Sequence, residues 1–177
     1  MGIRDEINAV KKTQEDLAAE KAQKEREQRE FAEKTIICNF ENAMKYAASK
    51  GGINKYGVLS GRFPFEKQMV HDDSRDGYTY IGLSCRHNET RNSVHKTTFF
   101  TNEWLDNVTI SPSQEILKDY EILRKYAMQE NIRLSNLYIV YNGSRHMNTT
   151  LKVTVPRFHD VDAYYAVDYS IDMNQNA

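Results

Sequence analysis

A stretch of the chain without proline or glycine, from Arg4 to Lys50, constrains the fold more than any other feature. Alanine, glutamate, lysine, glutamine and arginine dominate this stretch, and these residues have high helix propensities. The pair Gly51-Gly52 follows, and glycine just past the last turn commonly ends a helix. The sequence therefore predicts one unusually long helix that ends near residue 50.

The first part of this helix carries a thin apolar pattern. Ile7, Val10 and Leu17 follow alternating spacings of three and four residues if Gln14 takes the remaining slot. We expect residues 1–30 to form a solvated or coiled-coil helical extension, with these three apolar residues as the seam for self-association or docking. Because stable coiled coils usually need three or four heptads, a solvated helix that frays away from the domain is the alternative.

Charged residues dominate the next part of the helix. Between residues 19 and 30 no apolar residue is larger than alanine, and the acid-before-base pairs include Glu20/Lys24 and Glu25/Arg29. Each such pair stabilises an isolated helix by about 0.2–0.5 kcal/mol. These pairs support a helix in water, but they cannot drive its burial.

The apolar pattern thickens at the end of the helix. Ile37, Phe40, Met44 and Ala47 share one face, as in a helix that packs on a core. We therefore expect a compact domain over residues 31–172 and a disordered tail over 173–177.

Several shorter segments have the alternation or the β-branched and aromatic content of strands. They are 56–65, 78–86, 94–101, 137–141, 150–155 and 165–171. A second helix is expected to begin at a capping Ser111, with Pro112 as its first residue, and to end near Asn131. The predicted fold class is α+β: the long charged N-terminal helix followed by a mainly antiparallel sheet of about six strands packed on two helices.

Charge and composition limit the class of protein. The formal net charge is −1 and the sequence pI is about 6.5, so the chain lacks the overall basic field of a dedicated nucleic-acid binder. The chain begins with no apolar signal segment, and it contains no run of 18 apolar residues. We therefore expect a cytoplasmic protein without a membrane partner, in which Cys38 and Cys85 are buried free thiols.

The usual catalytic and metal-binding motifs are missing from the sequence. It contains no C-x-x-C, H-x-x-x-H, G-x-S-x-G or phosphate-cradling glycine loop. Residues 72–77 resemble the opening of a calcium loop, but Leu83 stands where that loop needs a glutamate, so a hairpin turn is the simpler reading. His71 and His159 are each followed by aspartate, and both His-Asp dipeptides are expected in surface loops. We predict no catalytic residue, metal or cofactor, and a small enzyme with a site assembled across loops is the third choice.

One probable hairpin, around residues 86–96, gathers basic side chains beside outward-facing tyrosines. Bases could stack on such tyrosines while the basic residues hold phosphates, although an ordinary polar hairpin is the plainer interpretation. The residues assigned to partner binding are Tyr78, Tyr80, Arg86, Arg91, His95 and Lys96.

The leading hypothesis is a non-enzymatic protein–protein interaction module, such as a regulator or inhibitor of a larger cytoplasmic protein. Its N-terminal helix would mediate homodimer formation or docking, and its protein partner is not identified by the sequence. A tyrosine-rich sheet face or the hairpin would supply the second contact, since tyrosine and arginine are favoured at interfaces. A nucleic-acid-binding module that uses the basic hairpin is the second choice.

Overall fold

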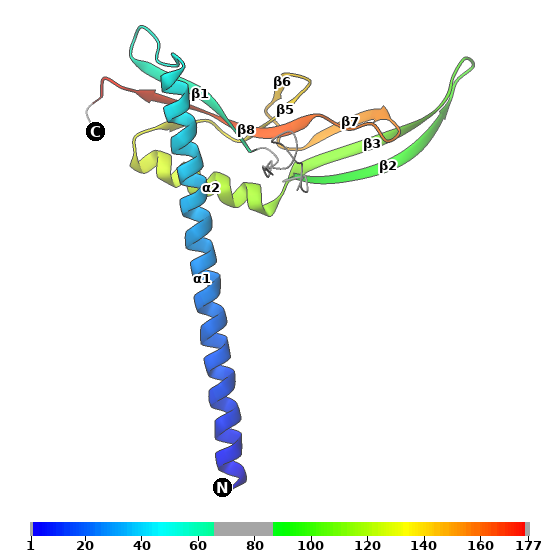
Figure 1. Ribbon diagram of the computed structural model, residues 1–177. Coiled ribbons are helices and arrows are strands. Elements are labelled where there is room, and N and C mark those ends of the chain that lie inside the picture. Colours follow the sequence, from blue (N-terminus) through cyan, green and yellow to red (C-terminus); the bar gives the residue numbers. More distant parts are fainter. Residues whose placement is uncertain (1, 66–86, 176–177) are drawn as a thin grey trace, which may run out of the picture.

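The long helix is the dominant element of the computed structural model, which describes residues 2–65 and 87–175 (Figure 1). Helix α1 spans Ile3–Ser49, so the predicted helix is confirmed. Gly51 ends it with a φ of +81°, a conformation that glycine adopts without strain, and the Gly52 amide donates to the Ala47 carbonyl at 2.8 Å. At about 1.5 Å per residue, its 47 residues extend roughly 70 Å.

The rest of the described chain contains eight strands and a second helix. In chain order they are β1 (Val58–Phe65), β2 (His87–Thr97), β3 (Asn102–Pro112), α2 (Gln114–Gln129), β4 (Arg133–Leu134), β5 (Tyr138–Tyr141), β6 (Ser144–His146), β7 (Leu151–Pro156) and β8 (Ala163–Asp172). All of the strand pairs are antiparallel. The α+β class with a long N-terminal helix and antiparallel pairing is therefore confirmed.

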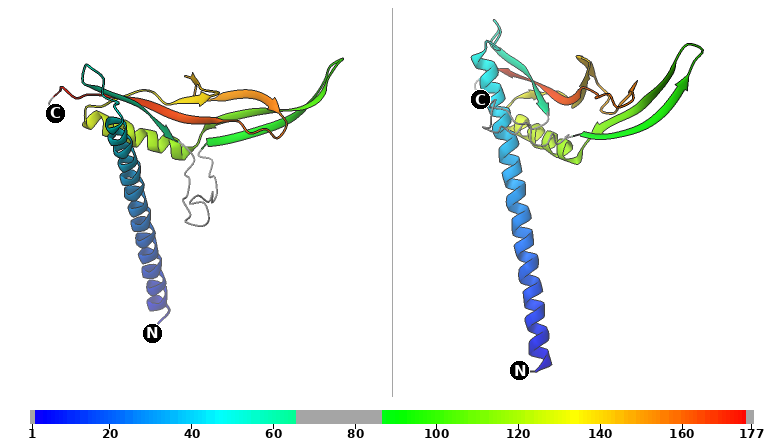
Figure 2. Two further views of the ribbon diagram at one scale, coloured as in Figure 1. Left: turned by 45° about the horizontal axis from the view of Figure 1, so that its top comes forward. Right: turned by 45° about the vertical axis from the view of Figure 1, so that its right-hand side comes forward.

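The strands form two sheets, whereas the sequence had suggested a single sheet of about six strands. One sheet has five strands in the order β1-β8-β5-β6, with β4 also paired to β8, and the other has three strands in the order β2-β3-β7. Strands β2 and β3 form a long hairpin that projects from the body of the molecule, away from α1 (Figures 1 and 2).

Apolar side chains from both helices and both sheets form one core. Phe40 of α1 is fully buried, and its ring meets Phe63 and Tyr169 edge-on at centroid distances of 5.3 and 5.4 Å. Ile116 and Leu123 of α2 lie in the same core. The α1 residues that reach this core begin near Ile36, so the core anchors only the C-terminal part of the helix.

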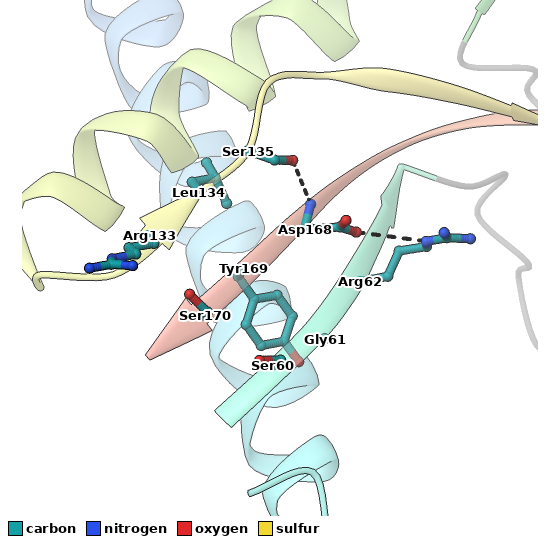
Figure 3. A pocket seen from close by; sticks show the side chains of 9 residues that line it. All are labelled: Ser60, Gly61, Arg62, Arg133, Leu134, Ser135, Asp168, Tyr169 and Ser170. Carbon is teal, nitrogen blue, oxygen red and sulfur yellow. Dashed lines mark hydrogen bonds and ion pairs between the residues drawn. The ribbon is translucent and has the colours of Figure 1, made fainter. Parts of the chain in front are cut away.

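Gly61 of β1 lies where a side chain would collide with the core. A Cβ atom built on it would lie 2.3 Å from the Tyr169 hydroxyl and 2.6 Å from the adjacent ring carbon. Tyr169 faces Gly61 from the neighbouring strand β8 (Figure 3). The absence of a side chain at position 61 is therefore what allows the Tyr169 ring to pack.

Three local predictions are wrong. The polar stretch 87–93 belongs to strand β2, and Phe99 and Phe100 lie in the turn after it instead of within a strand. Strand β2 exposes both of its faces, so it needs no apolar alternation. Helix α2 is capped by Ser113, whose Oγ accepts from the Ile116 amide at 3.2 Å, because residues 111 and 112 still pair with β2.

Two further expectations concern the cysteines and the end of the chain. Cys38 is exposed, contrary to the predicted buried thiol, because it lies on the side of α1 away from the core. In the segment expected to be a tail, the Met173 amide donates to the Gly57 carbonyl at 2.9 Å and Asn174 Nδ2 to the Tyr56 carbonyl at 2.7 Å. The predicted strand 78–86, the candidate calcium loop 72–77 and Cys85 lie outside the described residues.

Candidate interaction surfaces

The N-terminal part of α1 is exposed on all sides. Every residue from 3 to 34 is exposed, and the helix projects away from the domain in every view (Figures 1 and 2). The predicted seam residues Ile7, Val10 and Leu17 expose 58%, 58% and 60% of their surface. Single exposed apolar residues are common on proteins, but here they repeat along one side of an otherwise polar helix.

One of the predicted acid-before-base pairs, Glu20/Lys24, forms in the polar part of this helix. Lys24 Nζ lies 3.3 Å from Glu20 Oε1, and Gln23 donates to Glu27 at 3.0 Å. Such exposed pairs contribute little individually. They keep the segment helical in water without giving it a surface to pack on.

Arg91, one of the predicted partner-binding residues, is engaged within the protein. Its Nη1 lies 2.8 Å from the His159 carbonyl oxygen and 3.3 Å from Asp106 Oδ2, and its Nε lies 2.5 Å from Glu89 Oε1. These bonds join β2 to β3 and to the loop after β7. A guanidinium held in this way is not available to grip a phosphate without giving up these partners.

Asp106 is almost completely buried. It is the centre of a cluster, called the Asp106 clasp below, that also contains Arg91, Ser93 and the Phe158 amide. Its carboxylate accepts from Ser93 Oγ at 2.6 Å and from the Phe158 amide at 2.9 Å, and it pairs with Arg91. These bonds, that from Ser93 first, lower the pKa of Asp106 below its ordinary value. The sequence offered no signal for this cluster, because its members come from three distant segments.

Beyond the clasp, aromatic side chains accumulate on the projecting hairpin. The His95 ring lies 4.8 Å from the Trp104 ring, and the Arg157 guanidinium lies within 5.0 Å of Trp104 and 4.6 Å of Phe158. Lys96, the other predicted basic residue of this strand, is exposed. The predicted residues Tyr78, Tyr80 and Arg86 lie outside the described residues.

The tip of this hairpin presents two phenylalanines to solvent. Phe99 and Phe100 expose 96% and 91% of their surface, and their rings contact each other at 5.1 Å. The turn is closed by the Thr98 amide, which donates to the Thr101 carbonyl at 2.7 Å. Turns usually carry glycine, proline or small polar residues, so this exposed pair is the apolar feature of the domain most in need of an explanation.

The solvent-side face of the five-stranded sheet carries a compact polar network. Tyr138 is fully buried there, with the Arg145 guanidinium 4.4 Å and the Arg62 guanidinium 5.5 Å from its ring centre. Its hydroxyl donates to Asp168 Oδ1 at 2.5 Å, and Arg145 pairs with the same carboxylate. Burial, and secondly the bond to Asp168, raises the pKa of Tyr138 to about 12. Tyr138 is therefore structural and does not form the open tyrosine surface that the strand pattern suggested.

A hollow of about 680 Å³ lies beside this network, between β1, β8 and β4 (Figure 3). Asp168 faces Arg62 across it, with 3.8 Å between the carboxylate and Nε, and the Ser135 hydroxyl accepts from the Asp168 amide at 2.8 Å. The hollow is lined by Ser60, Gly61, Arg62, Arg133, Leu134, Ser135, Asp168, Tyr169 and Ser170. Arginines thus neutralise the Asp168 carboxylate in this hollow. The lining residues include serines but no histidine that could act as a base for one of them.

Over residues 2–65 and 87–175, no group of three or more histidine, cysteine or acidic side chains is arranged to hold a metal ion. Within the same residues no helix is long and apolar enough to cross a membrane. No protein-family model matches the sequence, and comparisons with curated proteins and with solved structures find no match either. The surfaces described above are therefore the basis for inferring a function.

Proposed function

We propose that this protein is a non-enzymatic interaction module whose N-terminal helical extension mediates association, either with a second copy or with a different protein. One observation carries the proposal: residues 3–34 of α1 are exposed and bear a repeated apolar seam. The core contacts of α1 begin near Ile36, so the seam contributes nothing to the core. A helix this polar gains little stability without packing, which supports a partner for the seam.

The β2–β3 hairpin is proposed as the second contact, with a larger cytoplasmic protein that the module regulates or inhibits. Phe99 and Phe100 are the anchors, since large aromatic side chains dominate the binding energy of many interfaces. Val94 and Trp104 expose 40% and 49% of their surface and add apolar area on opposite faces of the hairpin, since Trp104 lies across from His95. The Asp106 clasp supports this role because it ties the middle of the hairpin to the loop after β7 and so holds the outer part that carries Phe99 and Phe100.

The nucleic-acid alternative has less support from the described residues. Of its basic residues, Arg91 already bonds to Glu89, Asp106 and the His159 carbonyl, and His95 lies against Trp104. Lys96 alone would then remain to bind phosphate among the described members of the predicted cluster. Binding that weakens steeply with salt would restore this alternative, because counterion release drives phosphate recognition.

Removal of residues 1–30 tests the association role of the helix. The shortened chain keeps the α1 residues that reach the core, including Ile36, Phe40 and Met44, so it should fold. Light scattering coupled to size exclusion is expected to give a dimer for the full chain and a monomer for residues 31–177, whose far-ultraviolet signal should lose only the helical contribution of the removed residues. A monomeric mass for both proteins would overturn self-association and leave only docking on a different protein.

A further inference from the structure

The apolar seam of α1 is longer than its three predicted members. With alternating spacings of three and four residues, the first series of positions recurs every seven residues. These positions are occupied by Ile3, Val10, Leu17, Lys24, Phe31 and Cys38. The second series is Ile7, Gln14, Lys21, Gln28 and Thr35. Ile3 and Phe31 expose 68% and 74% of their surface. Ile7, Val10 and Leu17, the other apolar residues of the seam, expose 58%, 58% and 60%.

This extended seam runs on the side of the helix that faces away from the domain. Phe31 precedes the core residue Phe40 by nine residues, or about two and a half turns, so the two side chains point to opposite sides. Cys38 follows Phe31 by about two turns and is exposed, with Asn42 Nδ2 3.7 Å from its Sγ. A second helix can therefore follow the seam to Phe31 over exposed positions, whereas Thr35, between Phe31 and the exposed Cys38, is half-buried.

We propose that α1 pairs with α1 of a second copy, parallel and in register, along the seam from Ile3 to Cys38. This inference rests on the proposed function, and it names the partner and its orientation. In a parallel pair each seam residue faces its own copy, so Ile3, Ile7, Val10, Leu17 and Phe31 all meet apolar partners. A full-length antiparallel pair would instead set Leu17 against Lys21 and Val10 against Gln28 of the second copy.

The charges beside the seam do not decide the orientation, because a full-length antiparallel pair would also set Glu6 beside Lys34 and Lys11 beside Glu25. In the parallel register Glu6 of each helix lies beside Lys11 of the other, which gives two attractive contacts. The same five-residue offset sets Glu20 of each helix beside Glu25 of the other, which gives two repulsive contacts next to the facing Lys21 and Lys24 layers. Gln14 is the polar residue inside the apolar part, a position at which a buried amide fixes register.

A shorter antiparallel pair would set Ile7 against Leu17 of the second copy, but it would also set Val10 against Gln14 and Ile3 against Lys21. That register places Lys11 beside Lys11 and Glu6 beside Glu20, so its flanking charges repel. The apolar layers therefore favour the parallel orientation, in which all five apolar seam residues meet apolar partners.

Cys38 allows a direct test on the full chain. A parallel pair brings the two Cys38 side chains together, so a short bis-maleimide should link them, as a peptide map by mass spectrometry will show. The Cys38→Ser variant should lose this link, and Leu17→Asp should lose both the link and the dimer mass. Ala19→Asp is the matched control, because the same substitution two residues later lies on the far side of the helix.

The outcomes separate the orientation from association itself. A dimer that gives no Cys38–Cys38 link, but does link Ile7→Cys to Leu17→Cys in a mixture of Cys38→Ser variants, is antiparallel and overturns the inference alone. A monomeric full chain at every concentration overturns self-association together with the inference. A Cys38–Cys38 link that survives Leu17→Asp would arise from collision and would also overturn the parallel seam.

Discussion

Truncation of Leu17 to alanine should weaken self-association by an amount that the exposure of this side chain sets. The change removes three carbon atoms, each contributing about 0.8 kcal/mol when fully buried. Leu17 exposes 60% of its surface in the single chain, so at that transfer energy about 1.4 kcal/mol would be lost per copy. For two copies the loss is about 3 kcal/mol, which raises the dissociation constant roughly a hundredfold.

Sedimentation equilibrium over a range of protein concentrations measures this constant directly. The matched control is Arg26→Ala, which truncates a longer side chain nine residues away, on the opposite side of the helix. Its dissociation constant should remain within a fewfold of the unmodified protein. Thermal unfolding at a concentration where all three proteins are monomeric should be unchanged, because residues 17 and 26 lie outside the core.

Two results would refute this reasoning. Equal weakening by Leu17→Ala and Arg26→Ala would mean that the helix associates through no particular face. An unchanged dissociation constant for Leu17→Ala, in a protein that does dimerise, would place the dimer contact elsewhere on the molecule.

Three other predictions concern the domain. Gly61→Ala should lower the free energy of unfolding by about 1–3 kcal/mol in urea titration, because the new methyl group overlaps the Tyr169 ring; the added change Tyr169→Phe should recover part of the loss, and full stability of the single variant would contradict the packing argument. Asp106→Asn should destabilise the protein at neutral pH. Because the folded-state pKa of this carboxyl is lowered, its contribution is present above the ordinary value of 3.8 and is lost as the pH falls through the folded value, so the two unfolding curves should converge in acid. Replacing Phe99 and Phe100 with serine should leave the unfolding midpoint unchanged, since both are exposed, while capture of a larger protein partner in a pull-down should be lost; retained capture would exclude the tip as the anchor.

The parts of the fold that follow local rules could be predicted from the sequence. The long helix is fixed by propensity and by Gly51, and neither depends on the rest of the chain. Strand β8 is also predictable, because Tyr165, Val167 and Tyr169 share a buried face, with Asp168 and Ser170 on the other face. Where one face of a strand is buried, apolar residues recur at every second position, so the sequence pattern reveals the strand.

Strand β2 could not be found in this way. All but its first residue are exposed, so nothing selects an apolar alternation, and its strand conformation comes from pairing with β3 along the whole hairpin. Phe99 and Phe100 misled the prediction in the opposite direction, because aromatic residues are common in strands and rare in turns. The exposure of β2 explains why its sequence pattern did not reveal it. The exposure of Phe99 and Phe100 makes the tip of the hairpin a candidate for binding.

The candidate surfaces also differ in how far they could be predicted from the sequence. Ile7, Val10 and Leu17 were identifiable because a seam on a single helix is a periodic feature of one segment. The engagement of Arg91 was not, because Asp106 lies 15 residues away and the His159 carbonyl 68 residues away along the chain. A list of basic residues in a hairpin does not distinguish a free guanidinium from one that holds the hairpin in place.

Substitutions on the two projecting surfaces, the N-terminal part of α1 and the outer part of the β2–β3 hairpin, should not affect folding, for one physical reason. Each surface leaves the domain just beyond an anchor: α1 beyond Ile36, and the hairpin beyond the Asp106 clasp. Beyond these anchors the helix is supported by its own backbone bonds and the hairpin by its own ladder. Substitutions in the outer parts are therefore expected to leave the free energy of unfolding unchanged, whereas substitutions at the anchors should lower it. A loss of association after changes to the exposed isoleucines or phenylalanines would support the proposed contacts with other chains.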